Sequence, residues 1–178
     1  MRNFIYLLYN VAMKKEAFTT PSVISLSQLR SLRPLITQRK IVLVGGCFDV
    51  LHYGHIAFLR KARNAGDYLI IAIESDKYIK INKKKIPIHN QKKRAEILAM
   101  LRVVDLIIML PYMQSDKDYF ELVQLIKPSI IAVAQGDSQM RNKTRQAESI
   151  GGVVEIVTPM VKNFSSSKMV KYENIFSN

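Results

Sequence analysis

Residues 41–55, with the sequence IVLVGGCFDVLHYGH, decide how this chain folds. The four consecutive apolar residues at 41–44 predict a buried β-strand, which ends at Gly45-Gly46. The apolar spacing that follows predicts a helix over 56–64. A buried strand that passes through paired glycines into a helix is typical of the first unit of a parallel α/β sheet.

The same alternation continues along the rest of the chain. Further strands are expected at 68–73, 104–110, 129–134 and 153–158, and further helices at 91–101, 116–126, 139–150 and 165–172. Near-continuous apolar strands separated by helices indicate a parallel sheet that is covered on both faces. The expected fold is therefore an α/β, Rossmann-like doubly wound sheet of about five strands. In such sheets ligands bind beyond the carboxyl ends of the strands.

The first 38 residues are interpreted as a short helical N-terminal extension (1–38), followed by one domain (39–178). Within the extension, Ser25–Arg30 predicts a short capped helix. The apolar run Phe4–Met13 is too short to span a bilayer, which takes about 20 residues. Because no small-x-small cleavage site follows it, an amphipathic helix that docks on the domain or on a partner subunit is preferred over a signal peptide.

Composition limits the classes of protein that the chain can belong to. Of its 178 residues, 48% are hydrophobic and 23% charged, which favours one folded domain over disorder or a membrane bundle. The single cysteine, Cys47, cannot form an internal disulfide and favours a cytoplasmic location. The net charge of +13 favours anionic partners, although the basic run Lys77–Arg94 is interpreted mainly as solvated surface.

Residues 45–55 also carry the features of an anion site. The paired glycines let a ligand approach the backbone closely, and Gly54 does the same where the helix begins. A helix N-terminus supplies N–H groups and partial positive charge. Two of the three histidines in the chain, His52 and His55, lie here, three residues apart.

Gly46-Cys47-Phe48-Asp49 followed by His52-x-Gly54-His55 resembles the phosphate-binding signature of the cytidylyltransferase-like nucleotidyltransferases. A second stretch, Phe164–Met169, is similar to the I-S-S/T-T-x-I motif of that family. The resemblance implies that Ser165, Ser166 and Ser167 hold a triphosphate at the N-terminus of the last helix, against the simpler alternative of a serine N-cap.

Other positions are assigned through the same resemblance. It implies that Arg94, in Lys92-Lys93-Arg94-Ala95-Glu96, contacts phosphate, and that either Lys83 or Lys84 is the mobile lysine on the triphosphate. Asp137 falls where the family places a G-D near nucleotide or substrate. A cap on the next helix explains Asp137 equally well.

Within the superfamily the pattern is most similar to heptose-1-phosphate adenylyltransferases. Several positions depart from it, and these departures leave the acceptor open. Ala134-Gln135-Gly136-Asp137-Ser138 stands for K-G-G-D-Y, Asn163 for a glycine, Ser165-Ser166-Ser167 for S-T-T, and Ile86 for an arginine before proline.

The resemblance implies an enzyme that transfers NMP, with AMP favoured, from an NTP to a phosphorylated small molecule such as a sugar 1-phosphate. Mg²⁺ is expected to be carried mainly by the NTP phosphates, without a protein metal site, and Asp49 is the expected protein contact to metal or nucleotide. A homodimer is also expected.

Three alternatives remain open. The first is a cytidylyltransferase for glycerol-3-phosphate or a phospho-amino-alcohol, and the second is a flavin adenylyltransferase. The third, disfavoured by the intact motifs, is a non-catalytic nucleic-acid-binding protein.

Overall fold

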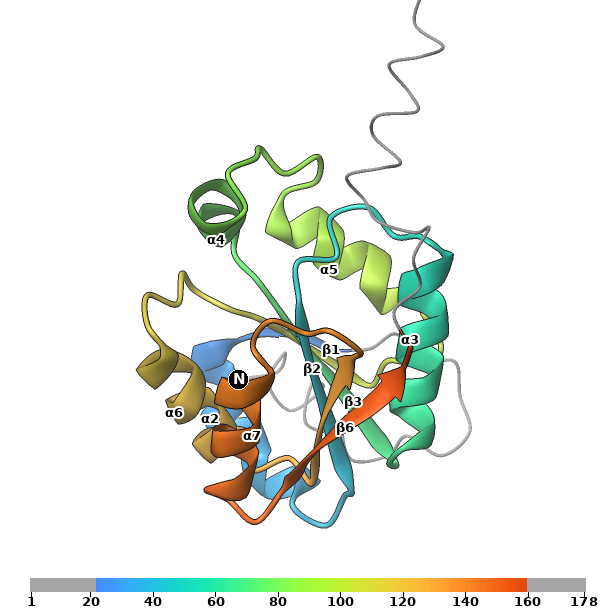
Figure 1. Cartoon of the computed structure of the whole chain (residues 1–178), viewed down its shortest axis with the longest axis vertical. Helices are drawn as coiled ribbons and strands as arrows, with labels where there is room; N and C mark the ends of the chain where they lie inside the picture. Colours follow the sequence, from blue (N-terminus) through green and yellow to red (C-terminus); the bar gives the residue numbers. More distant parts are fainter. Residues whose placement is uncertain (1–21, 160–178) are drawn as a thin grey trace, which may run out of the picture.

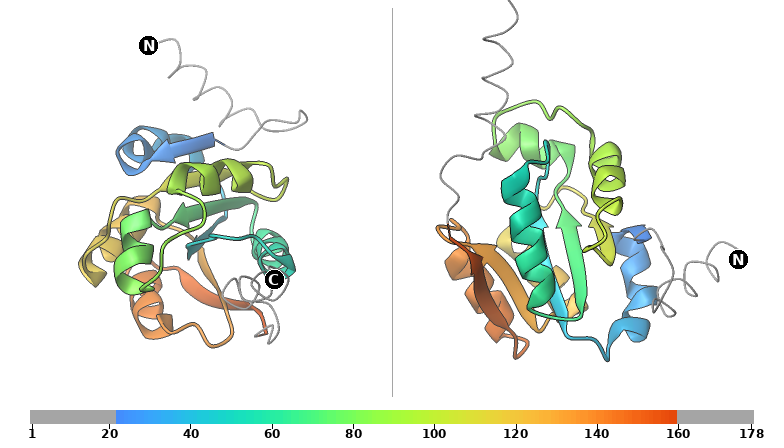
Figure 2. Two further views of the ribbon diagram at one scale, coloured as in Figure 1. Left: turned by 90° about the horizontal axis from the view of Figure 1, so that it is seen from above. Right: turned by 90° about the vertical axis from the view of Figure 1, so that its right-hand side faces the viewer.

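The computed structural model describes residues 22–159, which form a six-stranded sheet with helices on both sides (Figures 1 and 2). All the strands are parallel and lie in the order β1-β4-β3-β2-β5-β6. The strands are β1 (Ser22–Ser25), β2 (Ile41–Gly46), β3 (Tyr68–Ile73), β4 (Leu106–Met109), β5 (Ile130–Ala134) and β6 (Val153–Thr158). The expected Rossmann-like α/β class is confirmed.

Two groups of helices cover the two faces. On one face, α2 (Leu26–Leu32), the 3₁₀ turn η1 (Arg33–Ile36), α6 (Asp116–Ile126) and α7 (Met140–Glu148) pack in one apolar cluster; on the other, α3 (Tyr53–Asn64) and α5 (Gln91–Ala99) pack in a second. Alternate residues of β2, β3, β4 and β5 supply the two clusters, because successive side chains of a strand point to opposite faces. All six residues of β3 are buried. The sheet is therefore doubly wound, as the sequence predicted.

The strand order fixes where a ligand can bind. From β2 the chain moves to β3 and β4 on one side, and it returns to β5 on the other side of β2. This reversal is the switch point at which the loops after neighbouring strands diverge and leave a crevice. The helix α4 (Asp76–Asn82) follows β3 at the same carboxyl edge (Figure 1).

The structure corrects the expected number of strands from about five to six. The additional strand, β1, lies in the segment interpreted as an extension and pairs with β4, from Ser22 beside Leu106 to Ser25 beside Met109. Four residues with serine at both ends give no periodic signal, so this strand depends on its pairing with β4. The short helix expected at Ser25–Arg30 is confirmed as α2, with Ser25 as its N-cap.

The helix α4 was not predicted, because it is short, has one fully buried side chain (Ile79) and lies within the basic run except for its first residue. Among the described residues, no helix combines the length and apolar character that a bilayer crossing requires. The expected N-terminal amphipathic helix and the expected last helix at 165–172 lie outside the described residues.

Candidate active site

The turn after β2 is shaped by two glycines with different surroundings. A Cβ on Gly46 would lie 2.8 Å from Cε2 of Phe48, so the aromatic ring packs directly against this glycine. Phe48 itself has a φ of 48°, a left-handed conformation that is uncommon for a side chain of this size. A Cβ on Gly45 would meet no atom within 4 Å. The backbone of Gly45 is therefore open to a ligand.

The two histidines come together at the start of α3. His52 is its N-cap, and the His52 and His55 rings stack with centroids 3.8 Å apart. The Phe48 ring also contacts the His55 ring, with centroids 5.2 Å apart. Burial first and the neighbouring His52 second lower the pKa of His55 to about 4, against the opposing effect of a hydrogen bond with the Val50 backbone. At pH 7 His55 is therefore a neutral imidazole.

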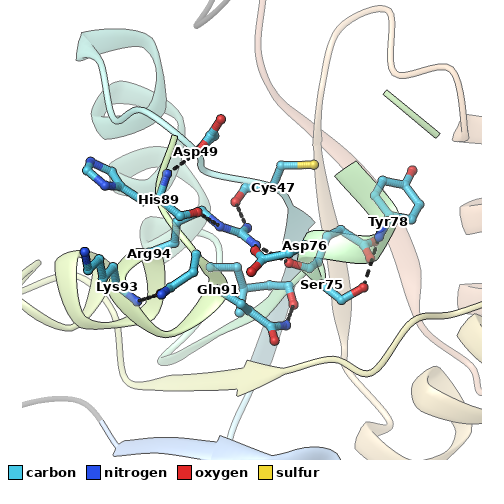
Figure 3. A network of polar contacts seen from close by, with 12 residues as sticks. Cys47, Asp49, Ser75, Asp76, Tyr78, His89, Gln91, Lys93 and Arg94 are labelled. Atoms are coloured by element: carbon cyan, nitrogen blue, oxygen red, sulfur yellow. Dashed lines mark hydrogen bonds and ion pairs between the residues drawn. The ribbon is translucent and has the colours of Figure 1, made fainter. Parts of the chain in front are cut away.

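Arg94 ties together the loops of this edge (Figure 3). Its side chain is fully buried and donates to the carbonyl oxygens of Cys47, Glu74 (2.8 Å) and His89 (3.0 Å). It also forms an ion pair of 2.7 Å with Asp76. These contacts occupy all three guanidinium nitrogens with protein groups. The sequence placed Arg94 at the correct edge of the sheet, but its described contacts are those of a positioning residue.

Asp49 also joins two loops at this edge of the sheet. The side chain is 5% exposed, and its carboxylate accepts hydrogen bonds from the amides of Ile88 (3.0 Å) and His89 (3.1 Å). The turn after β2 is thereby fastened to the loop before α5 (Figure 3).

A cleft of about 520 Å³ opens beside this turn, between α4, α6 and α7. Residues from the carboxyl ends of the strands and from these helices line it, among them Gly45, Gly46, Cys47, Glu74, Tyr78, Lys83, Tyr119, Asp137 and Lys143. Lys83 is part of the lining and Lys84, with a φ of 52°, is not. The geometry thus favours Lys83 of the two lysines between which the sequence could not choose.

The wall of the cleft contains a buried carboxylate that the sequence analysis did not select as a site residue. Glu74, directly after β3, is 7% exposed, and its Oε1 accepts a hydrogen bond of 2.9 Å from the hydroxyl of Tyr119 on α6. Burial raises the pKa of Glu74 to about 7, against the opposing effects of the Tyr119 hydrogen bond and of nearby positive charges, Lys143 first. Its place at the end of the strand next to β2 was the signal that could have identified it.

Asp137 makes contacts that fit both interpretations left open by the sequence, a cap on the next helix and a residue near the ligand. Its Oδ1 accepts from the amide of Gln139, just before α7, at 2.7 Å. Its Oδ2 forms an ion pair with Lys143, also at 2.7 Å, on the cleft wall. The side chain therefore holds the start of α7 in place and also borders the cleft.

Cys47 lines the cleft with its thiol in the protonated form. Burial raises the pKa of this thiol, and the Glu74 charge raises it further. Since the thiolate is the nucleophilic form, this environment does not favour Cys47 as a nucleophile.

The structure thus brings most of the predicted residues to one edge of the sheet. Gly46, Cys47, Phe48, Asp49, His52, Gly54, His55, Lys83, Arg94 and Asp137 all lie there. Lys84 is outside the cleft, and Ser165, Ser166 and Ser167 lie outside the described residues. Within residues 22–159, no three His, Cys, Asp or Glu side chains are grouped so as to hold a metal ion.

A parallel doubly wound sheet with a glycine turn, a helix N-terminus and a cleft at its switch point defines a nucleotide-binding α/β protein. Comparison with protein families identifies it further: residues 43–177 match the cytidylyltransferase-like family. The match covers most of the chain, which therefore belongs to this family. The expected enzyme class, a nucleotidyltransferase, is confirmed.

Individual relatives agree with this membership. The chain is 34% identical over 135 residues to the bifunctional protein HldE of Koribacter versatilis, covering 74% of this chain and 26% of that protein. It is 37% identical over 117 residues to the FAD synthase of Pyrococcus abyssi, covering 65% of this chain and 77% of that protein. The chain thus spans about a quarter of the length of the bifunctional relative.

One solved structure is similar to this chain in both fold and sequence. The lipopolysaccharide core biosynthesis protein from Thermoplasma volcanium matches with a TM-score of 0.56 and 30% identity, over 67% of this chain and 95% of that one. The resemblance drawn from the sequence motifs is confirmed.

Proposed function

We propose that the chain transfers an AMP group from ATP to the phosphate of a phosphorylated, hydroxyl-bearing small molecule and releases pyrophosphate. One observation carries the proposal: the stacked His52 and His55 lie at the N-terminus of α3, beside a glycine whose backbone is open to a ligand. A triphosphate placed there meets the cleft at Gly45 and Lys83 and leaves the rest of the cleft for the acceptor.

The reaction requires no nucleophilic side chain. The second pKa of a phosphate monoester is about 6, so the acceptor phosphate is largely dianionic near neutral pH. One of its oxygens attacks the α-phosphorus, a new P–O bond forms, and the bond to the pyrophosphate breaks. The protein therefore has to align the two reactants and stabilise the charge that develops on the phosphates.

The two histidines are assigned to this stabilisation. A neutral His55 donates a hydrogen bond through its N–H, and the approach of a triphosphate raises its pKa because a nearby negative charge favours the protonated form. Lys83 and the serines at 165–167 are assigned to the triphosphate. Arg94 and Asp49 are assigned to holding the loops in position.

Mg²⁺ fits this site as an ion carried by the NTP. The Asp49 carboxylate is already bonded to two amides, and Asp137 to an amide and Lys143. Coordination by phosphate oxygens and water is how Mg²⁺ is usually bound, with few protein ligands. The ion would neutralise phosphate charge while the side chains orient the reactants.

The resemblance of the sequence motifs to heptose-1-phosphate adenylyltransferases favours AMP and a sugar phosphate, and the similarity to HldE supports membership of the same family. A second candidate acceptor is FMN, because the chain covers 77% of the Pyrococcus FAD synthase, a larger share than it covers of HldE. Cytidylyl transfer to glycerol-3-phosphate or a phospho-amino-alcohol is the third.

Pyrophosphate release tests these candidates directly. Wild type is assayed with Mg²⁺ and each of ATP, CTP, GTP and UTP, against sugar 1-phosphates, glycerol-3-phosphate, phosphocholine, phosphoethanolamine and FMN. We expect turnover with ATP and a sugar 1-phosphate, lost in His55→Ala. Nucleic-acid binding that falls steeply with salt, together with no turnover and no NTP binding, would favour the non-catalytic alternative.

The homodimer and the cytoplasmic location remain predictions. Light scattering of the full chain measures the first, and fractionation of cells that express it measures the second.

A further inference from the structure

The cleft wall at Glu74 is built for a ligand group that the motifs of the chain do not specify. We infer that Glu74 is the residue that selects the acceptor, by accepting a hydrogen bond from one of its hydroxyl groups. This inference rests on the proposed function and names which part of the acceptor meets the protein at this wall.

The first observation is the uneven bonding of the carboxylate. Oε1 accepts from the Tyr119 hydroxyl, whereas Oε2 is buried and has no hydrogen-bond partner among residues 22–159. An unsatisfied buried acceptor has a free-energy cost, which is larger when the acceptor is charged. A ligand that donates a hydrogen bond to Oε2 would remove this cost. A ligand without such a donor would leave Oε2 unsatisfied and should therefore bind less well.

The second observation is that the main chain of Glu74 is fixed on both sides. Its amide donates to the carbonyl oxygen of Gly46 at 3.0 Å, and its own carbonyl oxygen accepts from Arg94 at 2.8 Å. The side chain is held by Tyr119. The carboxylate is therefore preorganised beside the glycine turn, and a ligand need not order it.

The charges around Glu74 decide which end of the acceptor it meets. A carboxylate disfavours a phosphate, so the acceptor phosphate points toward the turn and the histidines. The remainder of the molecule then faces Glu74. Lys83 and Lys143 lie close enough to act on the charge of Glu74, and both would oppose an ammonium group at this position.

The rest of the cleft suits a molecule with several hydroxyls. Its lining includes five side-chain carboxamides, each of which both donates and accepts hydrogen bonds: Asn82, Gln114, Gln139, Asn142 and Gln146. A sugar phosphate and the ribityl phosphate of a flavin share this polyhydroxyl chemistry, while phosphocholine lacks it.

The test compares Glu74→Gln with Glu148→Gln, a matched change at the exposed end of α7. With Oε1 still bonded to the Tyr119 hydroxyl, the amide nitrogen of the introduced glutamine takes the place of Oε2 and turns an acceptor into a donor. We expect kcat/KM for the acceptor to fall about ten- to hundredfold, with the KM for ATP unchanged. Glu148→Gln should match wild type.

Deoxy acceptors identify the hydroxyl. Glucose 1-phosphate and its monodeoxy analogues form one arm, and FMN forms the other. For one deoxy analogue, kcat/KM in wild type should fall as much as kcat/KM for glucose 1-phosphate falls in Glu74→Gln. In Glu74→Gln, kcat/KM should differ little between that analogue and glucose 1-phosphate, since both changes remove the same hydrogen bond. Additive effects at every position, or a loss confined to phosphoethanolamine and phosphocholine, would overturn the inference.

Binding separates this inference from the proposed function. Calorimetry with glucose 1-phosphate or FMN and a non-hydrolysable ATP analogue requires no turnover. Glu74-dependent binding without turnover would remove the proposed function alone. Turnover by wild type, with the same kcat/KM for the acceptor in Glu74→Gln and in Glu148→Gln, would overturn the inference alone. If neither the acceptor nor the ATP analogue bound, both the inference and the proposed function would be overturned. Tyr119→Phe, which frees Oε1, gives a second variant with a smaller expected loss.

Discussion

The glycine–histidine segment (Gly45–His55) and the wall around Glu74 lie at neighbouring strand ends, but the aromatic residues that contact His55 and Glu74 pack in apolar clusters on opposite faces of the sheet. Phe48, which packs on His55, is part of the apolar cluster under α3 and α5. Tyr119, which bonds to Glu74, packs against the cluster under α2, α6 and α7. Burial favours the neutral form of both His55 and Glu74, so it lowers the pKa of the imidazole and raises the pKa of the carboxyl group.

The glycine–histidine segment and the wall around Glu74 are suited to different tasks. The glycine–histidine segment combines a helix N-terminus with backbone that any triphosphate can approach, and its sequence motif is recognisable without a structure. The Glu74 wall is assembled from side chains on three helices, and its chemistry depends on which residues happen to face the cleft. We infer that the first segment serves the reaction and the second serves the choice of acceptor.

The largest effect is expected at Arg94, which joins the two regions. Arg94→Lys cannot reach three carbonyl oxygens and Asp76 together, so buried acceptors lose their partner. We expect a loss of about 3–5 kcal/mol in the free energy of unfolding, with no measurable turnover. Urea denaturation measures the first, with Arg60→Lys on the exposed side of α3 as the control. Full stability in Arg94→Lys would contradict the positioning role.

His55→Ala should affect the reaction without affecting the acceptor. Removing one donor to a developing phosphate charge typically lowers kcat by about 10²–10³. Because His55 does not line the cleft, the affinity for the acceptor should be unchanged, the opposite of Glu74→Gln. Steady-state kinetics with both substrates varied distinguishes the two patterns. An increase in the acceptor KM alone would mean that the regions do not divide the work in this way.

The dependence of stability on pH should have opposite signs in the two regions. The pKa of His55 falls from 6.5 to about 4 on folding, so unfolded chains bind a proton that the native state excludes, and stability is lost as pH falls from 6.5 toward 4. The pKa of Glu74 rises from 4.5 to about 7, so the native state retains a proton, and stability is lost as pH rises from 4.5 to 7.

Each of these contributions amounts to roughly 3 kcal/mol, and they offset one another between pH 4.5 and 6.5. Thermal denaturation from pH 4 to 8 should therefore show a steeper rise with pH in Glu74→Gln than in wild type. His55→Gln should show a steeper fall. Parallel curves for all three proteins would refute the assigned shifts.

The two glycines provide a smaller, matched contrast. The methyl of Gly46→Ala meets the Phe48 ring, and the overpacking should cost about 1–3 kcal/mol of stability. Gly45→Ala meets no protein atom and should leave stability nearly unchanged, but its methyl enters the cleft and should weaken ATP binding about tenfold. Thermal denaturation and calorimetric titration of ATP measure the two effects. Equal ATP affinity in Gly45→Ala and wild type would place the nucleotide elsewhere.

The smallest effect is expected within the basic run. Lys83 lines the cleft and Lys84 does not, so Lys83→Ala should raise the KM for ATP about fivefold to tenfold, and Lys84→Ala by less than about twofold. Both side chains are exposed, so added salt should reduce the difference. The reverse ranking would assign the triphosphate contact to Lys84.

Much of this architecture could be predicted because it depends on local patterns. The bounds of β3, α6 and β6 were predicted to the residue, since β3 and β6 are short runs rich in β-branched apolar residues and α6 is a helical segment followed by Pro128. The strand β1 could not be predicted, because its four residues have no strand pattern of their own and form a strand by pairing with β4. The task of Arg94 was also out of reach: a charged side chain in a basic run gives no sign that it will be fully buried among carbonyl oxygens.

The sequence by itself determined the doubly wound sheet, the glycine turn and the two histidines at the start of a helix. These follow from hydrophobic period, backbone freedom and helix-terminus electrostatics, which act over a few neighbouring residues. The tertiary structure decided that Arg94 and Asp49 hold loops, that Lys83 rather than Lys84 faces the cleft, and that Glu74 meets Tyr119 from 45 residues away. Those outcomes depend on which side chains converge and on how far burial removes them from water, and neither is encoded in any short stretch of the chain.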